Sequence, residues 1–477
     1  MRFHFKGTLV LLIVCLALGG YVYFYEIKGG EKREKAKEAE KQVWKFEGSD
    51  IQQIDLISQG QHISAVRKAG RDWILTSPRT LEADTDELNR LANSASNIQR
   101  ESVVESNATN LAKYGLSPPK SSLEVKTKGG KQYLIDFGNS NPTGSNAYAT
   151  IPGKKEVFLV SSSVVTAFDK KTDELRNQTI LGFEQPEAQS LVLKSSKGEL
   201  QLEKDSDDRW WLVGKEKVAA DSPGVRGILN ALSTGKVKEF FNEPAGEYRD
   251  LGFTNPVVDV RLTYGKNKGI KHLVIGLEKG KLQKKSPPPA PAKEAAEQAA
   301  TQLYLAKDES RQDLFFVEKD LVDKLLKSRN DLRDKALASI QRWDVDSIAL
   351  TNSKGIFAFI KSGGEWFLAD KKKKAKWESV NAVLDVMEKP VKEWIDQPGP
   401  LSGYGLDKPQ IRVILKKGPE VLADCSFGKA AKDGIYAEVR GDSSVKVADP
   451  EGLNALDKGE TDFVEPPPAP ADAKNKK

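Results

Sequence analysis

The sequence predicts an α+β fold in which one N-terminal transmembrane helix precedes three tandem repeat modules with mainly antiparallel sheets. Three observations predict it: an uncharged apolar run near the N-terminus, a short signature that occurs three times, and strand-like alternation around each copy. A chain of 477 residues is long enough for about three domains.

The composition argues against several classes of protein. With 39% hydrophobic and 30% charged residues, the chain suits a soluble body and not a polytopic membrane protein. The net charge of +6 is small, and acids and bases are interspersed, which argues against a nucleic-acid partner. The two cysteines are Cys15, inside the apolar run, and Cys425, so we expect no intrachain disulfide and infer no compartment from them.

Residues 7–25 carry no charged side chain and follow a short tail, residues 1–6, with Arg2 and Lys6. At about 1.5 Å per residue, such a helix just spans a hydrocarbon core of roughly 30 Å. A cleaved signal peptide is the competing interpretation, because Ala17-Leu18-Gly19 loosely fits a cleavage site. We expect an uncleaved anchor with a cytoplasmic N-tail, since apolar and aromatic residues continue beyond that site.

Residues 26–43 predict a charged stalk, because acids and bases alternate there at helical spacing. Two Lys or Arg residues precede the apolar run and six follow it within this stalk. A bare count of positive charges would place the following side in the cytoplasm, although long domains are often exported regardless. The residues alone therefore leave the orientation open.

The signature is an aromatic or Leu residue, Gly, an apolar residue, two variable residues and Pro. Its copies begin at Tyr114, Leu251 and Tyr404. A Trp-led apolar triplet precedes each copy by 41, 40 and 38 residues, at Trp73, Trp211 and Trp366. An apolar-Gly pair follows after 24, 25 and 24 residues, ending at Gly138, Gly276 and Gly428. This agreement predicts repeat modules at 44–182, 183–340 and 341–464.

Each module contains an apolar-periodic helix between the Trp triplet and the signature, at 83–98, 220–233 and 375–388. Asp84 with Glu87 forms a capping-box pattern, and Asp221 can cap the second helix with Pro223 in its first turn. Lys376 occupies the equivalent place in the third module, so the modules share no carboxylate chemistry there.

The second module contains a Pro/Ala-rich inserted loop, residues 284–300, and a similar run closes the chain as a disordered tail, residues 465–477. Segments of this composition cannot bury a core. Tolerated low-complexity insertion and a flexible arm that touches a partner are both compatible with this pattern.

The signature has the residue types of a helix stop. In the first copy, Asn107 can cap a short helix, Gly115 suits the left-handed position after it, and Leu116 suits the apolar contact that follows. Pro119 prevents the helix from resuming. Ser117 and Lys120 formally match the Ser-x-x-Lys of acylating enzymes, but two intervening prolines and the absence of the pair from the other copies argue against that chemistry.

Two further groups allow a structural or a functional interpretation. The basic run Lys371–Lys374 is either solvated or a contact for acidic headgroups or an acidic partner. The pair Trp210-Trp211 is either core packing or a sugar platform. We find no phosphate-binding, dinucleotide-binding or metal-ligand motif, so we expect no catalytic, cofactor-binding or metal-ligating residues and no cofactor.

The segment DELRNQTIL (173–181) matches NDLRDKALA (330–338), and the third copy frays out at LDKGETDFV. Together with the repeated YGL-x-x-P, apolar-Gly and Tyr-Ala elements, these segments make the chain resemble the bacterial domain-of-unknown-function family 4340. The resemblance implies one N-terminal anchor with the repeats outside the cytoplasmic membrane. It also implies genes beside ABC-2-type transporter components similar to those of gliding-motility systems, and it supplies no catalytic residue.

We therefore expect a protein of the bacterial inner membrane, single-pass, with most of its chain in the periplasm. The leading hypothesis is a non-enzymatic accessory or scaffold protein whose partner is an ABC transporter permease or another envelope protein. The alternative is a binding module for envelope polysaccharide or peptidoglycan, suggested by the eight tryptophans. A hydrolase, the third possibility, would need a cleft of clustered acids.

Overall fold

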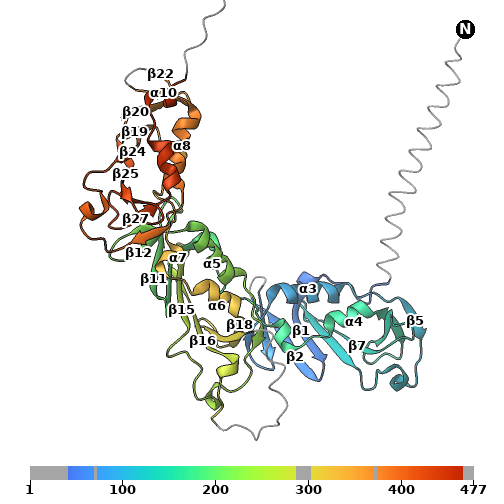
Figure 1. Cartoon of the computed structure of the whole chain (residues 1–477). Coiled ribbons are helices and arrows are strands. Elements are labelled where there is room, and N and C mark those ends of the chain that lie inside the picture. Colours follow the sequence, from blue (N-terminus) through green and yellow to red (C-terminus); the bar gives the residue numbers. More distant parts are fainter. Residues whose placement is uncertain (1–40, 69–71, 286–301, 370–372, 466–477) are drawn as a thin grey trace, which may run out of the picture. The chain divides into compact units, whose positions relative to one another are not determined.

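The computed structural model describes residues 41–68, 72–285, 302–369 and 373–465 (Figure 1). The predicted anchor, most of the stalk, most of the inserted loop and the tail from Pro466 lie outside the described residues. Among the helices that are described, none is both long and apolar enough to cross a bilayer.

Three nine-stranded sheets carry the described chain, which confirms the α+β class with antiparallel sheets (Figure 1). We call the segments with these sheets the first, second and third repeats. By contacts the chain divides into two compact units. The first unit is Met1–Ile180 with Lys236–Pro244 and Arg311–Val317, and the second is Leu181–Gly235, Ala245–Ser310 and Glu318–Lys477.

The first sheet lies in the first unit and has the order β4-β3-β2-β1-β6-β7-β8-β9-β5. Its strands are β1 (Ile51–Ser58), β2 (Gln61–Arg67), β3 (Trp73–Ser77), β4 (Leu81–Glu82), β5 (Ser102–Glu105), β6 (Ser121–Thr127), β7 (Gln132–Ser140), β8 (Asn146–Thr150) and β9 (Val157–Ser161). Helix α3 (Thr85–Ser96) leads from the edge strand β4 toward the opposite edge strand β5. Its buried side chains include Leu88, Leu91 and Ala95, which join the core formed by the inward face of the sheet.

The second sheet repeats this order as β13-β12-β11-β10-β15-β16-β17-β18-β14. Its strands are β10 (Ala188–Ser195), β11 (Gly198–Lys204), β12 (Trp210–Val213), β13 (Val218–Ala219), β14 (Glu239–Phe240), β15 (Val258–Tyr264), β16 (Gly269–Glu278), β17 (Leu303–Asp308) and β18 (Leu314–Glu318). Helix α5 (Ser222–Thr234) corresponds to α3. The inserted loop falls between β16 and β17, as predicted.

The third sheet lies in the second unit and has the order β22-β21-β20-β19-β24-β25-β26-β27-β23. Its strands are β19 (Ser347–Asn352), β20 (Gly355–Ser362), β21 (Glu365–Leu368), β22 (Lys373–Lys374), β23 (Glu393–Ile395), β24 (Ile411–Lys417), β25 (Glu420–Ala430), β26 (Ile435–Val439) and β27 (Val445–Ala448). Helix α8 (Trp377–Glu388) covers its core, in which Val380, Leu384 and Met387 are buried.

Short helices follow the last long strand of each repeat. They are α4 (Ser162–Phe168) and η4 (Thr172–Leu175) in the first repeat, α6 (Lys319–Leu325) and α7 (Arg329–Leu332) in the second, and α9 (Leu453–Leu456) and α10 (Glu460–Phe463) in the third. The third repeat therefore does not fray out at its end, because α10 occupies the place of α7 and buries Phe463 as α7 buries Leu332.

The predicted Trp register is wrong by one residue in the second repeat. Leu75, Leu212 and Leu368 pair with the neighbouring edge strand in the same way, opposite Leu81, Val218 and Lys373. The Trp two positions earlier is therefore Trp210 and not Trp211. Trp210 is buried, as Trp73 and Trp366 are, while Trp211 lies on the other face because strand side chains alternate.

The signature is a helix stop in the first and third repeats. Gly115 and Gly405 adopt left-handed φ values of 69° and 70°, and each ends a 3₁₀-helix, η3 (Leu111–Tyr114) and η10 (Leu401–Tyr404). The amide of Leu116 donates to Leu111 and that of Gly115 to Ala112, which is the predicted C-terminal bonding pattern. In the second repeat Gly252 is also left-handed, but the short helix before it ends at Glu247 and does not reach it. Tyr248 instead forms an isolated bridge with Lys284, where the inserted loop begins.

Two capping predictions need correction. Asn110 and not Asn107 caps η3, because a 3₁₀-helix of one turn begins only there. Asp84 accepts from the Glu87 amide, which is one half of the predicted capping box, while the Glu87 carboxylate pairs with Arg90 and Lys170 instead. Asp221 lies before α5 without a side-chain cap. Pro223 occupies the second position of α5 and has no N–H to offer that carboxylate.

The apolar-Gly pairs explain why their spacing from the signature is nearly constant. A Cβ on Gly138 would collide with the carbonyl oxygen of Tyr114, and a Cβ on Gly428 would meet that of Tyr404 in the same way. In the second repeat Gly276 lies against the carbonyl of Leu251. The long strand therefore passes directly against the signature turn, and only glycine permits that approach.

We expect Gly138→Ala to lower the free energy of unfolding of the first repeat by about 1–3 kcal/mol, because backbone must shift to admit the methyl group. Chemical denaturation followed by circular dichroism measures this loss. Gly129→Ala is the matched control, since no atom lies within 4 Å of its added Cβ. Equal midpoints for the two variants would refute the close approach.

Candidate functional site at a buried arginine

Each of the first two repeats ends its short helix immediately before an arginine. Leu175 and Leu332 are buried, and the carbonyl of each accepts a hydrogen bond from the amide of the residue directly before the long helix, Asp84 or Asp221. The arginine that follows, Arg176 or Arg333, forms an isolated bridge with Ala83 or Ala220. The short helix thus fixes where the arginine side chain begins.

Arg176 is 1% exposed and lies within the first unit. Its Nη1 donates to Asp173 at 2.9 Å and to the Asn242 side-chain oxygen at 2.8 Å. Its Nη2 lies 3.0 Å from a carboxylate oxygen of Asp313, which is itself buried. The guanidinium carbon stands 3.5 Å from the ring centre of Phe240. Arg176 of the first repeat is therefore enclosed largely by side chains of the second repeat, namely Asn242, Asp313 and Phe240.

Arg333 repeats this arrangement within the second unit. Its Nη1 donates to Asp396 at 2.6 Å, and its Nη2 donates to the hydroxyl of Ser444 at 2.8 Å and to Asp442 at 3.3 Å. Trp394 takes the place of Phe240, with the guanidinium carbon 5.5 Å from its ring centre. We call these two arrangements the first and second arginine sites.

The third repeat has Val464 at the corresponding position, bridged to Ala375 as the arginines are bridged to Ala83 and Ala220. The first repeat, in turn, offers Glu156 where the second offers Asp313, because both residues directly precede the strand that pairs with the edge strand. Its own Arg100 lies 3.0 Å from Glu156 and stacks on Phe158. The acidic position is thus neutralised within the repeat.

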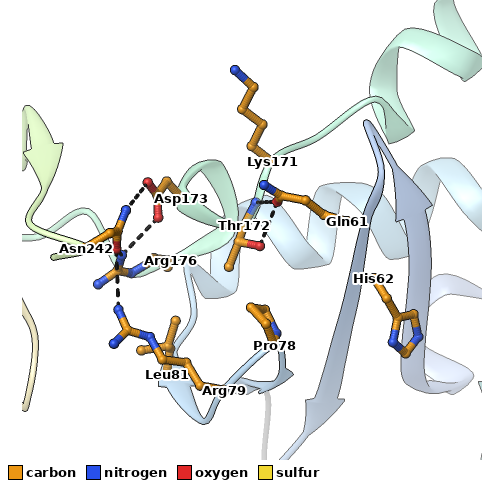
Figure 2. A pocket seen from close by; sticks show the side chains of 10 residues that line it. All are labelled: Gln61, His62, Pro78, Arg79, Leu81, Lys171, Thr172, Asp173, Arg176 and Asn242. Atoms are coloured by element: carbon orange, nitrogen blue, oxygen red, sulfur yellow. Dashed lines mark hydrogen bonds and ion pairs between the residues drawn. The ribbon is translucent and has the colours of Figure 1, made fainter. Parts of the chain in front are cut away.

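A cavity of about 400 Å³ opens beside the first arginine site (Figure 2). Its lining residues are Gln61, His62, Pro78, Arg79, Leu81, Lys171, Thr172, Asp173, Arg176 and Asn242. Figure 2 shows Asp173, Arg176, Asn242 and Arg79 clustered on one side. His62 stands on the opposite side, and Lys171 extends away from the cluster. The Thr172 amide and hydroxyl both donate to the side-chain oxygen of Gln61, at 3.1 and 3.0 Å.

The residues singled out from the sequence lie elsewhere. Ser117 and Lys120 are exposed in the turn after Gly115, and no hydrogen bond joins them among the described residues. Lys373 and Lys374 form ion pairs with Glu460 and Glu365, while Lys371 and Lys372 lie outside the described residues.

The tryptophan pair also forms no open platform. Trp210 belongs to the core, and Trp211 donates its ring N–H to Asp205 at 2.8 Å. Burial of Asp205 opposes ionisation, but this bond and the neighbouring amides outweigh it and lower the pKa of Asp205 to about 2. Trp211 therefore serves a local ionic cluster with Arg209.

Sequence reasoning missed the two arginines as a site. Their signal was present in the repeated Leu-Arg of the segments that begin at Asp173 and Asn330. Arginine is almost never buried unless it is paired, so a repeated arginine after a buried leucine needed partners. Apart from Asp173, which lies three residues before Arg176, those partners lie far along the chain, and the sequence does not reveal them.

The family model for the domain of unknown function DUF4340 matches residues 73–211, which confirms the resemblance for that part of the chain. The match runs from the Trp that opens β3 to the one after Trp210, so it covers one period of the repeat. No curated protein and no solved structure matches the chain.

We expect Arg176→Met to destabilise the first arginine site by about 3–5 kcal/mol, because the buried carboxylate of Asp313 loses its counter-ion. Hydrogen exchange of full-length protein, read in peptides covering 236–244 and 311–317, measures the local opening. Arg90→Met is the control, since Arg90 is exposed and solvent screens its ion pair with Glu87. Unchanged protection in Arg176→Met would contradict the assigned role.

The second arginine site should weaken in acid. Burial opposes the charge of Asp442, but Lys446 and Ser444 outweigh it and hold the pKa of Asp442 below its ordinary value of 3.8. A depressed carboxyl pKa contributes stability above the unfolded-state pKa, and this stability is lost as the pH falls through the folded-state value. The loss therefore occurs below pH 3.8.

Urea midpoints at about pH 6 and about pH 3 test this, and the acid-induced loss should be smaller in Asp442→Asn than in the wild type. Asp207→Asn, which removes an exposed carboxylate, should leave the acid-induced loss unchanged. The assignment is wrong if both variants behave alike.

Proposed function

We propose that this DUF4340 protein is a membrane-anchored, non-enzymatic scaffold or accessory protein of an ABC-type transport system, with its repeats on the periplasmic side of a bacterial inner membrane. The twice-repeated arginine site is the observation that carries the proposal. A buried guanidinium group enclosed by residues of the following repeat favours a defined arrangement of successive repeats, and a scaffold needs such an arrangement.

The features that recur in all repeats support the same role. The left-handed signature glycine, the glycine against it and the buried Trp each serve the packing of one repeat. Polar groups outside this framework differ from repeat to repeat, as Asn242 and Asp396 do. Surfaces that differ on a common framework suit several distinct contacts with partner proteins.

The transporter as partner and the membrane anchor rest on other grounds. The DUF4340 resemblance implies genes beside ABC-2-type transporter components, and residues 7–25 have the length and composition of a spanning helix. The third repeat adds exposed apolar side chains on its sheet, Ile356 and Ile360 of β20, and the exposed Trp343. Apolar side chains gathered on a surface are typical of protein contacts.

The alternative, binding of envelope polysaccharide or peptidoglycan, is favoured by two exposed tryptophans, Trp343 at 76% and Trp377 at 62% exposure. Exposed aromatic rings are suited to stacking on sugar rings. Trp210 is a poor test of this idea, because it is buried and its removal would damage the core. Trp343→Ala with Trp377→Ala is the informative variant.

We expect a photo-crosslinking side chain at Ile356 or Trp343 of the full-length protein, in intact cells, to form an adduct with a transporter permease identified by mass spectrometry. The same probe at exposed Lys266, on the second repeat, is the control. Absence of any permease adduct at the apolar positions would refute the scaffold hypothesis. Binding to isolated cell wall that is lost in the double tryptophan variant would support the alternative.

A further inference from the structure

We propose that the cavity beside the first arginine site binds a compact anionic group, a phosphate or carboxylate of a small molecule or lipid headgroup, with Arg79 as its counter-ion. The proposal goes beyond the scaffold role and holds whichever assembly the chain serves. The cavity volume of about 400 Å³ lies within the range of about 300–1,000 Å³ usual for small-molecule sites.

The comparison of the two arginine sites supplies the first argument. Asn242 and Asp396 occupy the same place, each two residues after the aromatic ring that stacks on the arginine. At the second site this place holds a carboxylate that binds Arg333 at 2.6 Å. At the first site this position holds a neutral amide and carries no negative charge, although Arg176 has two carboxylate partners, Asp173 and Asp313, as Arg333 does.

An additional guanidinium group stands beside this neutral amide. The Nη2 of Arg79 lies 3.4 Å from the Asn242 side-chain oxygen, which already accepts the 2.8 Å bond from Arg176. One neutral oxygen thus faces two cations. Within the described part of the chain Arg79 has no carboxylate within ion-pair distance, and it is exposed at the cavity wall.

The two carboxylates that pair with Arg176 are already engaged. Asp173 binds Arg176 and also accepts from the Asn242 amide group at 2.8 Å, while Asp313 pairs with Arg176 from the buried side. The charge of Arg176 is therefore compensated and that of Arg79 is not. The lining side chains of the cavity carry an excess of positive charge, from Arg79, Lys171 and Arg176 against Asp173.

The remaining walls suit a small anion with a short apolar or polar body. Pro78 and Leu81 line the cavity beside Arg79, and Gln61 lines it from β2 (Figure 2). The two bonds from Thr172 hold the Gln61 oxygen, and the Gln61 amide N–H groups have no acceptor among the described residues. Arg79 offers a planar fork that matches two oxygens of a phosphate or carboxylate, and Gln61 adds neutral donors.

The test uses full-length protein in neutral-detergent micelles, with inorganic phosphate and acetate as probes at constant ionic strength. Isothermal titration should show saturable binding of at least one probe, weakened about tenfold or more in Arg79→Gln, because a charge-assisted bond is lost. Arg226→Gln, which removes an exposed arginine of α5, is the control and should bind as the wild type does.

Asn242→Asp is the second variant, and it guards against loss of folding as an explanation. It supplies at the first site the carboxylate that Asp396 supplies at the second and gives Arg79 a counter-ion. Because it also removes the bond from Asn242 to Asp173, circular dichroism of the variant checks that the fold persists. We expect this variant to bind the probe at least tenfold more weakly with unchanged circular dichroism. Nanodiscs with or without phosphatidylglycerol distinguish a lipid headgroup from a free anion.

The proposal is overturned if the wild type shows no saturable binding of phosphate, acetate or the anionic lipid. It is equally overturned if Arg79→Gln and Asn242→Asp bind as tightly as Arg226→Gln does.

Discussion

The enclosure of a guanidinium group is the interaction on which the coupling of successive repeats depends. A buried charge destabilises a protein unless its partners are complete. Arg176 and Arg333 are paired with carboxylates, an amide or hydroxyl oxygen and an aromatic face, although the Nε of Arg176 has no acceptor among the described residues. Because most of these groups lie in or beside edge strands and their neighbours in the following repeat, the charge is compensated only when those strands are in place.

Comparison of the three repeats shows that the arginine of one repeat and the aromatic residue of the next occur together. In the second and third repeats, which contact the arginine of the preceding repeat, the edge strand carries Phe240 or Trp394. In the first repeat the corresponding residue is Val103, which pairs with Phe158 as Phe240 pairs with Phe315. Val103 is exposed and offers no π face. The aromatic ring is therefore part of the arginine site and not a general requirement of the fold.

The fold class, the three copies and the helix stop were predictable because their signals are local. Gly115 and Leu116 lie within a few residues of the bonds that they make, and the spacing to Gly138 reflects one direct contact. The predicted position of the core Trp was wrong in the second repeat, where two tryptophans are adjacent, because residue types alone do not show which of the two faces the core. Burial and strand pairing decide that.

The arginine sites and the cavity were not predictable for a different reason. Asn242 lies 66 residues from Arg176 along the chain, and neither residue type indicates that the other is its partner. The short helix at the end of the third repeat was also missed, because Phe463 replaces leucine and Val464 replaces arginine. Repeats are recognised in a single sequence at positions where the same residue type recurs. The residues that contact the arginines differ from repeat to repeat, so the comparison of repeats does not reveal them.

Because the third repeat has Val464 where the first two have an arginine, the order of the repeats matters for the arginine sites. Recombination that places the end of the first repeat before the third would bring an arginine to Trp394 and Asp396, which already receive one from Arg333. Recombination that places the end of the third repeat before the second would bring valine to Phe240 and leave Asp313 without an incoming cation. The first repeat would not be affected in this way, because Glu156 already pairs with Arg100 of the same repeat. A repeat like the second can therefore follow the third only if an arginine replaces Val464.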